Sequence, residues 1–273
     1  MYIHKCNKCD IVFYSELSSD KCPMCNNIEL KSQLIDKYSY DYIIPFSVTK
    51  TDAIDKFNNV FKGKKLIPNS IKNINVEESI KKIYIPCYLY DVSIEGEARY
   101  IIDGNDTSRI AHIDYKMVPS IATRLVDEAR IDGFDMSKLI PFNPSYLEGS
   151  YVIYSDVTSS EGIIKISDDT ILSAVDLIGN VNSGEYKEIS NDLVIKPINT
   201  YLALLPIYMI KTTYKDKNYT YVINGDNCKL LGTLPISYFK IVAWFISLFD
   251  LFFIIGLIIL LIIKGVMIWK NYW

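Results

Sequence analysis

Four cysteines in two C-x-x-C pairs lie within the first 25 residues of the chain. The pairs are Cys6–Cys9 in "CNKC" and Cys22–Cys25 in "CPMC", and 12 residues separate them. Zn²⁺ binds four thiolates in a tetrahedron, and such a site is structural because no position stays open for water or substrate. We therefore predict one structural zinc ion and a zinc ribbon over residues 1–30, with a short β-hairpin between the pairs. Two redox dithiols are the alternative, but they need a thioredoxin-like βαβ context that the sequence lacks.

The ribbon segment has no excess of positive charge for nucleic acid. Residues 1–36 hold four lysines against five acids, and a four-thiolate zinc site adds about two negative charges. Because phosphate contacts dominate nucleic-acid affinity, we expect a protein-contact or purely structural ribbon and no nucleic-acid partner. Phe13 and Tyr14 at the hairpin are candidate partner contacts, or bases could stack on them. Packing across the ribbon is the alternative.

A second feature, an apolar run near the C-terminus, predicts a membrane anchor. The run covers residues 241–263, and its 23 residues include one ionisable group, Asp250. As a helix with a rise of about 1.5 Å per residue, the run spans a hydrocarbon core of roughly 30 Å. Aromatic residues flank the run, as at membrane interfaces. We predict a single transmembrane helix, followed by a short tail over 264–273, in a tail-anchored arrangement.

The orientation of the anchor follows from the cysteines and not from the flanking charge, because two lysines lie on each side of the run. Reduced zinc thiolates and the absence of a signal-type N-terminus place the main domain on the cytoplasmic side of the cell membrane. Asp250 at mid-span costs about 2.5–3.5 kcal/mol on insertion scales. We interpret it as a contact with a partner helix; a protonated acid tolerated in a very apolar helix is the alternative.

Between ribbon and anchor, we predict a linker over residues 31–42 and a sheet-rich α+β domain over 43–238. A helix is expected from a cap at Thr49 to a stop at Gly63, with Ala53, Phe57 and Phe61 on one face. Further helical spacing covers 120–130 and 168–178. Strands are expected over 82–94 and 97–103, broken at Gly96, and over 108–118; a hairpin with the turn "KDKN" lies within 201–235. Pro86 and Pro206 are expected at sheet edges.

The sequence also echoes itself weakly. "YIIPF" (42–46) is similar to "KLIPF" (138–142), and "YIPCYLY" (84–90) to "LLPIYMI" (204–210). These matches suggest two similar α+β lobes packed together.

The order of these segments, with the stretch "YVINGDNCKLLGTLP", resembles the bacterial TFIIB-type zinc-ribbon membrane proteins over nearly the whole chain. The family usually has N-G-x-T-G-x-x-x-G and Pro-x-Trp. Here Asn227–Cys228 replace Thr-Gly, and the Pro-x-Trp positions read Pro86-Cys87-Tyr88 and Pro206-Ile207-Tyr208. The resemblance implies a membrane protein associated with SPFH/flotillin-like, PspA-like and TPM-domain membrane-stress proteins, with no known catalytic residues.

The sequence offers little for catalysis. It has two histidines, His4 and His112, which we interpret as a ribbon surface residue and a strand residue. The acid pairs Asp127–Glu128 and Asp168–Asp169 are expected on solvated faces, and the remaining thiols, Cys87 and Cys228, are either isolated or disulfide-bonded. We expect no enzyme but a membrane-anchored scaffold or adaptor with protein partners. A membrane-tethered nucleic-acid-binding or transcription-associated protein is the alternative.

Overall fold

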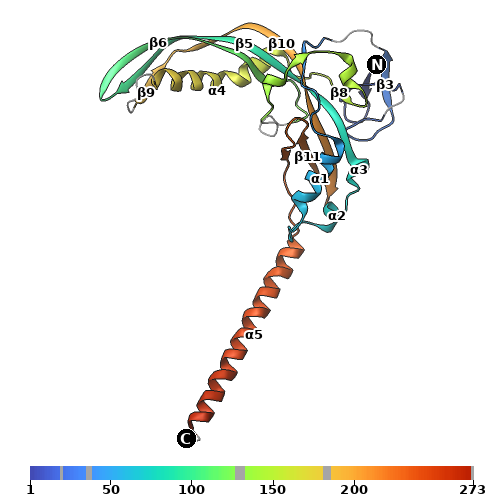
Figure 1. Cartoon of the computed structure of the whole chain (residues 1–273), viewed down its shortest axis with the longest axis vertical. Helices are drawn as coiled ribbons and strands as arrows, with labels where there is room; N and C mark the ends of the chain where they lie inside the picture. Colours follow the sequence, from blue (N-terminus) through green and yellow to red (C-terminus); the bar gives the residue numbers. More distant parts are fainter. Residues whose placement is uncertain (19–20, 35–38, 127–132, 181–185, 272–273) are drawn as a thin grey trace.

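A computed structural model describes the chain except for residues 19–20, 35–38, 127–132, 181–185 and 272–273. The described strands join in one mixed sheet, and a long apolar helix leaves the body at one end (Figure 1). The strands are β1 (Tyr2–Cys6), β2 (Val12–Ser15), β3 (Leu30–Leu34), β4 (Tyr42–Ile43), β5 (Ile80–Ile102), β6 (Asn105–Ile121), β7 (Ile140–Pro141), β8 (Tyr151–Ile153), β9 (Tyr186–Asn191), β10 (Val194–Tyr214), β11 (Lys217–Asn224) and β12 (Leu230–Leu231). The helices are α1 (Lys50–Phe61), α2 (Asn69–Lys72), α3 (Val76–Ser79), α4 (Ser159–Gly179) and α5 (Tyr238–Asn271), with 3-10 turns η2 (Met136–Lys138) and η3 (Pro144–Leu147). A cysteine-bearing N-terminus, a sheet-rich α+β body and a C-terminal apolar helix confirm the predicted class.

Two long antiparallel strands, β5 and β10, form the centre of the sheet. The predicted break at Gly96 is wrong, because Gly96 lies inside β5, a continuous strand of 23 residues. Gly96 has a φ of +140°, and a Cβ there would lie 2.7 Å from the backbone oxygen of Asp192. The N–H of Glu97 donates to the Asp192 carboxylate at 2.6 Å, and the N–H of Asp192 donates to the carbonyl of Glu97 at 3.0 Å. The glycine therefore admits a neighbouring chain and does not end the strand.

Pro86 and Pro206 lie inside the central strands, so their predicted place at sheet edges is wrong. The carbonyl of Pro86 accepts from Ala122 N–H and that of Pro206 from Gly225 N–H, both at 2.9 Å. Both carbonyls thus point away from the β5–β10 ladder, and in a strand the N–H of a residue points to the same side as its C=O. Beside Pro86 the outer neighbour of β5 changes from β8 to β6, and beside Pro206 the outer neighbour of β10 changes from β4 to β11. The backbone N–H groups that the two prolines lack are therefore missing at the points where one outer strand replaces another.

The helix predicted after Thr49 is confirmed as α1. Thr49 and Asp52 form the capping box, and Ala53, Phe57 and Phe61 are buried. These side chains pack on β10 and β11, where Phe57 and Phe61 meet the buried ring of Tyr221 edge to face.

The helix predicted over 120–130 is wrong in its described part. Ile121 ends β6, paired with Cys87, and the chain then turns through 124–126; residues 127–130 lie outside the described part. The helix predicted over 168–178 is confirmed, but it begins earlier, at Ser159. The predicted hairpin is β10–β11, and its turn is tighter than "KDKN". Lys215 and Asp216, both with positive φ, form a two-residue connection.

Residues 42–52 and 151–161 fold in the same way. Each segment starts with a short strand and ends in a capping box, at Thr49 for α1 and at Thr158 for α4. The strand β4 pairs in parallel with β10, and β8 pairs in parallel with β5. The segments "YIIPF" and "KLIPF" are instead partners, since β4 and β7 pair with each other. The repeat seen in the structure therefore uses a different second segment from the predicted one.

The two Pro-x-Tyr segments tie these repeats together. Tyr208 Oη donates to the carbonyl of Val48 at 2.9 Å, and Tyr88 Oη donates to the carbonyl of Val157 at 3.1 Å. Each tyrosine comes from the long strand of one half, and each carbonyl precedes the helix cap of the other half. The halves are therefore interlocked, whereas the sequence suggested lobes packed side by side.

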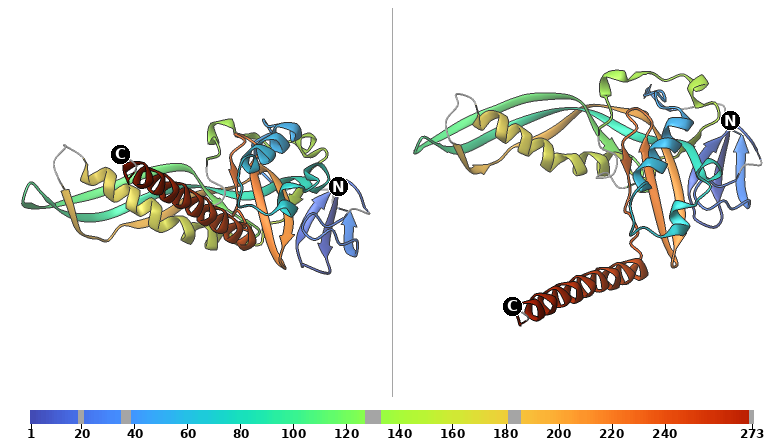
Figure 2. Two further views of the ribbon diagram at one scale, coloured as in Figure 1. Left: turned by 90° about the horizontal axis from the view of Figure 1, so that it is seen from below. Right: turned by 60° about the horizontal axis from the view of Figure 1, so that its bottom comes forward.

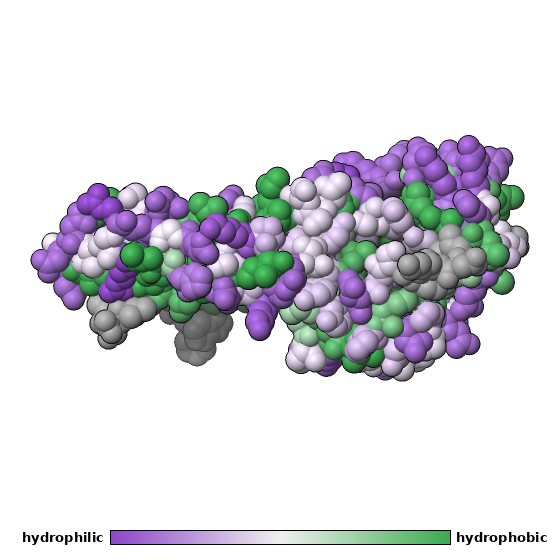
Figure 3. All heavy atoms as spheres, turned by 90° about the horizontal axis from the view of Figure 1, so that it is seen from above, coloured by the Kyte–Doolittle hydropathy of each residue, from purple (hydrophilic) through white to green (hydrophobic). Residues whose placement is uncertain are grey.

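The body is elongated. The β5–β6 hairpin, with β9 and α4, extends to one side, and the N-terminal strands lie on the other side (Figures 1 and 2). Helix α4 covers this extension through Ala174, Val175 and Ile178. Seen from the face opposite α5, hydrophobic side chains lie in small groups among polar ones (Figure 3).

Candidate metal centre

The four predicted zinc ligands come together at one point. The Sγ atoms of Cys6, Cys9, Cys22 and Cys25 all lie within 4.8 Å of one another. The distances Cys6–Cys25 and Cys9–Cys22 are both 3.5 Å. A tetrahedral site with Zn–S bonds of about 2.3 Å has S–S edges of about 3.8 Å. The four sulfurs can therefore hold one metal ion in a closed four-thiolate site.

The two cysteine loops stabilise a thiolate at Cys6. Burial alone would raise the pKa of Cys6, but hydrogen bonds from the backbone of Cys9 and Lys8 and from neighbouring thiols lower this pKa to about 6. The N–H of Lys8 lies 3.4 Å from the sulfur, and Asn27 Nδ2 lies 3.8 Å from it. Asn27 is an outer partner of the site that spacing alone did not reveal. Burial raises the pKa of Cys22.

The ribbon is part of the main sheet. The hairpin predicted between the two cysteine pairs is wrong in its position: β1 ends at Cys6, so the β1–β2 hairpin turns through the first pair, and β3 pairs with the other side of β1. The ribbon thus extends to Leu34, past the predicted boundary at residue 30 and into the predicted linker. Strand β2 also pairs with β8, with Phe13 opposite Ile153. Cys6 and Cys22 share one hydrophobic cluster with Ile83 and other residues of the body.

Phe13 and Tyr14 are buried, which contradicts their prediction as partner contacts. Phe13 is 0% exposed and lies between the ring of His4, at 5.0 Å, and that of Tyr151, at 5.8 Å. Tyr14 is 9% exposed and packs with Tyr84. The two side chains point to opposite faces of β2, and each is covered by a different hydrophobic cluster.

His4 is also buried, so its interpretation as a ribbon surface residue is wrong. Its Nδ1 lies 2.7 Å from Ser32 Oγ, and its Nε2 lies 3.0 Å from Ser15 Oγ. Both ring nitrogens are thus engaged between β1, β2 and β3, and His4 acts as a structural link within the ribbon.

Helix α5 projects from the body as a single long element (Figure 1). Its stretch Tyr238–Met267 is long and apolar enough to cross a membrane. The predicted span 241–263 lies within this stretch. Asp250 is exposed, near the middle of the span. The helix is attached at its start, where Lys240 Nζ donates to the carbonyl of Ile67 and to Asn69 Oδ1, both at 2.7 Å. No local pattern in the sequence indicated this attachment.

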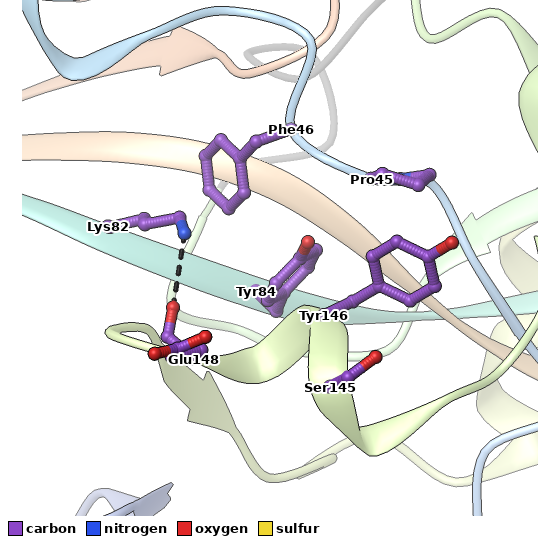
Figure 4. A pocket seen from close by; sticks show the side chains of 7 residues that line it. All are labelled: Pro45, Phe46, Lys82, Tyr84, Ser145, Tyr146 and Glu148. Carbon is purple, nitrogen blue, oxygen red and sulfur yellow. Dashed lines mark hydrogen bonds between the residues drawn. The ribbon is translucent and has the colours of Figure 1, made fainter.

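An open pocket of about 480 Å³ lies between the start of β5 and η3 (Figure 4). Lys82 lies 5.0 Å from the centre of the Phe46 ring, and its Nζ donates to the backbone carbonyl of Glu148 at 3.2 Å. Burial lowers the pKa of Lys82, and Glu148 opposes that change. Ser145 lies next to Tyr146, and Tyr84 lies between this serine and Lys82 (Figure 4). The pocket therefore does not place its serine against its amine.

The stretch that carries the most specific family likeness forms a buried turn. Asp226 is 6% exposed, and its carboxylate accepts from Lys138 Nζ at 2.5 Å and from the N–H of Asp135 at 3.2 Å. Asn224 Oδ1 accepts from the N–H of Asp226 at 2.8 Å. The hydrogen bond to Asp226 raises the pKa of Lys138. These contacts join η2 to the end of β11, which gives the stretch a structural role.

The remaining candidates lie apart. His112 is an exposed strand residue 3.7 Å from Glu95, and Asp168 and Asp169 are exposed on α4. The pair at 127–128 lies outside the described residues. Cys87 and Cys228 form no disulfide and belong to different hydrophobic clusters. Within the described residues, the four cysteines are the one group of three or more potential metal ligands of the His, Cys, Asp and Glu types.

Comparison with known proteins gives one relative. "Uncharacterized protein YdjG" of Bacillus subtilis (strain 168) is 24% identical over 225 residues, which cover 74% of this chain and 66% of the relative. The chain thus spans slightly less than two thirds of that protein. None of the known protein-family models matches the chain, and no solved structure matches it.

Proposed function

We propose that this chain is a membrane-anchored zinc-ribbon scaffold without catalytic activity, with its body on the cytoplasmic side. The observation that carries the proposal is helix α5. It is long enough to span a bilayer, it stands clear of the body, and it carries one exposed acid, Asp250, near its middle. In this reading, α5 fixes the protein in the cell membrane and offers Asp250 to another helix.

The zinc ion has a structural role in the proposal. The four sulfurs fit the tetrahedral thiolate set that Zn²⁺ prefers, and reduced cysteines fit the cytoplasmic side. Zinc would hold the two cysteine loops together, and β2 would connect them to β8 of the body. The metal thereby stabilises the sheet and leaves no ligand position for chemistry.

In this proposal the contact with a partner protein lies within the membrane, at Asp250. An acid at mid-span costs about 2.5–3.5 kcal/mol on insertion scales, and such residues commonly pair within a helix bundle. Beyond its attachment to α2 at Lys240, helix α5 has no other helix beside it in the described part of the chain (Figures 1 and 2), so the pairing group would come from another protein. The resemblance to TFIIB-type zinc-ribbon membrane proteins suggests SPFH-like or PspA-like membrane-stress proteins as the source.

Purification of the full-length protein from detergent-solubilised membranes after mild crosslinking tests this function. We expect membrane proteins of the SPFH or PspA type with wild type and with Asp250→Asn, which keeps a polar group in the helix. Asp250→Leu should lose them and still fractionate with membranes. Equal recovery with Asp250→Leu would reject the assigned contact. Recovery of RNA polymerase or nucleic acid in place of membrane proteins would favour the transcription-associated reading.

A further inference from the structure

The turn of the body next to α5 is basic, although the whole chain has a formal net charge of −3. Between Lys56 and Val76 the sequence contains lysines at 56, 62, 64, 65 and 72 and no aspartate or glutamate. We call Lys62–Leu66, the turn between α1 and α2, the basic turn. Its three lysines are exposed, and none forms an ion pair within the described part of the protein. The local charge differs in sign from the bulk charge.

The basic turn is fixed to the start of α5. The carbonyl of Leu66 accepts from the N–H of Ser237 at 2.9 Å. Lys240 makes two further bonds, to Ile67 and Asn69, at 2.7 Å each. The basic turn therefore lies next to the point in space where the apolar helix begins (Figures 1 and 2). If α5 enters a bilayer there, this turn lies at the level of the phosphate groups.

Exposed apolar side chains surround the same point. Leu66 is 37% exposed, Ile236 53%, Tyr238 73% and Phe239 81%. Aromatic side chains are enriched at the interface between headgroups and hydrocarbon. Lysine side chains extend their charge outward from apolar stems. Together these residues form a surface with positive charges beside groups that can insert between lipids.

We propose that the basic turn binds the headgroups of anionic phospholipids in the membrane that α5 enters. The proposal rests on the proposed function in one respect, the insertion of α5. Each ammonium offers a compact charge to a lipid phosphate. A lysine near an anionic membrane surface gains roughly fivefold in affinity. The body would thus be held against the membrane by lipids as well as by its helix.

Lipid titration of the full-length protein, followed by native mass spectrometry in detergent, tests the proposal. Wild type should bind phosphatidylglycerol at least about tenfold more tightly than phosphatidylcholine. The variant Lys62→Gln, Lys64→Gln, Lys65→Gln should lose this preference. A matched control, Lys31→Gln, Lys116→Gln, Lys187→Gln, removes three exposed lysines on strands β3, β6 and β9 and should keep it.

Unchanged preference in the basic-turn variant, or none in wild type, would overturn the proposal. Carbonate extraction of membranes separates this failure from failure of the anchor. If α5 does not insert, wild type and both variants leave the membrane at high pH. If α5 inserts and the lysines do not bind lipid, all three proteins remain in the membrane and have the same affinity for each lipid.

Discussion

Replacing Phe13 with alanine tests whether the ribbon and the body are one structural unit. Phe13 is 0% exposed and packs between His4 of the ribbon and Tyr151 of the body. Truncation of a buried phenylalanine costs about 3–5 kcal/mol. A domain of this size loses about 2–4 °C in Tm per kcal/mol. We therefore expect Phe13→Ala to lower the Tm by roughly 10 °C.

The assay is thermal unfolding of the detergent-solubilised protein, followed by circular dichroism, with a chromophoric chelator to detect zinc release. Leu17→Ala is the matched control, because Leu17 belongs to the same ribbon and is 63% exposed; its Tm should change by less than about 2 °C. In Phe13→Ala, zinc release and loss of sheet should shift together, since β2 belongs to both ribbon and main sheet.

A Phe13→Ala protein with the Tm of wild type would refute this reasoning. If the same variant also lost protein partners, Phe13 would be a contact residue, as its position in the sequence first suggested. A lower temperature of zinc release with an unchanged temperature for the loss of sheet would show that the ribbon unfolds independently of the body.

Three further results are expected. Lys240→Met removes the two hydrogen bonds that hold the start of α5 and should lower the local stability there by about 1–2 kcal/mol. Amide hydrogen exchange in the basic turn should become faster, and unchanged exchange would contradict this prediction. Hydrogen bonds from the backbone and side chain of Thr158 lower the pKa of Glu161 below its ordinary 4.5, so its cap stabilises α4 above that pH and is lost as pH falls through the lowered pKa. The Tm difference between wild type and Glu161→Gln should therefore be present at neutral pH and shrink in acid, and a constant difference would argue against the cap. In Gly225→Ala the new Cβ would lie 2.7 Å from the Phe46 ring, so unfolding in denaturant should show a loss of about 1–3 kcal/mol, and none if the ring moves freely.

Local signals in the sequence were sufficient for elements that depend on neighbouring residues. The Thr49 capping box, the apolar face of α1, the C-x-x-C loops and the apolar run of α5 all lie within short segments, and the structure has each of them. Their physical basis is local: a side chain satisfies an N–H three residues away, and two intervening residues bring two sulfurs together.

Features that depend on distant residues were not predictable in this way. Pro86 looks like an edge residue until β8 and β6 are seen to exchange places beside it. Gly96 looks like a break until Asp192 is seen to occupy the space of its absent side chain. Phe13 and Tyr14 looked available because the pairing of β2 with β8 joins residues about 140 positions apart, beyond the reach of periodicity.

The basic turn illustrates the same limit for function. A net charge of −3 gave no reason to expect a lipid-binding surface. The three lysines of the basic turn gained meaning only when the bonds of Ser237 and Lys240 placed that turn beside the start of α5. Charge distribution in space, and not total charge, determines attraction to a membrane.

The most direct test of the account is the zinc content per chain of the full-length protein extracted from membranes, determined by plasma mass spectrometry against quantitative amino-acid analysis. The account predicts one zinc per chain in wild type and less than about a tenth of that in Cys9→Ser, since loss of one thiolate opens a closed site. A folded, membrane-extracted wild type without zinc or another metal at this ratio would contradict the account.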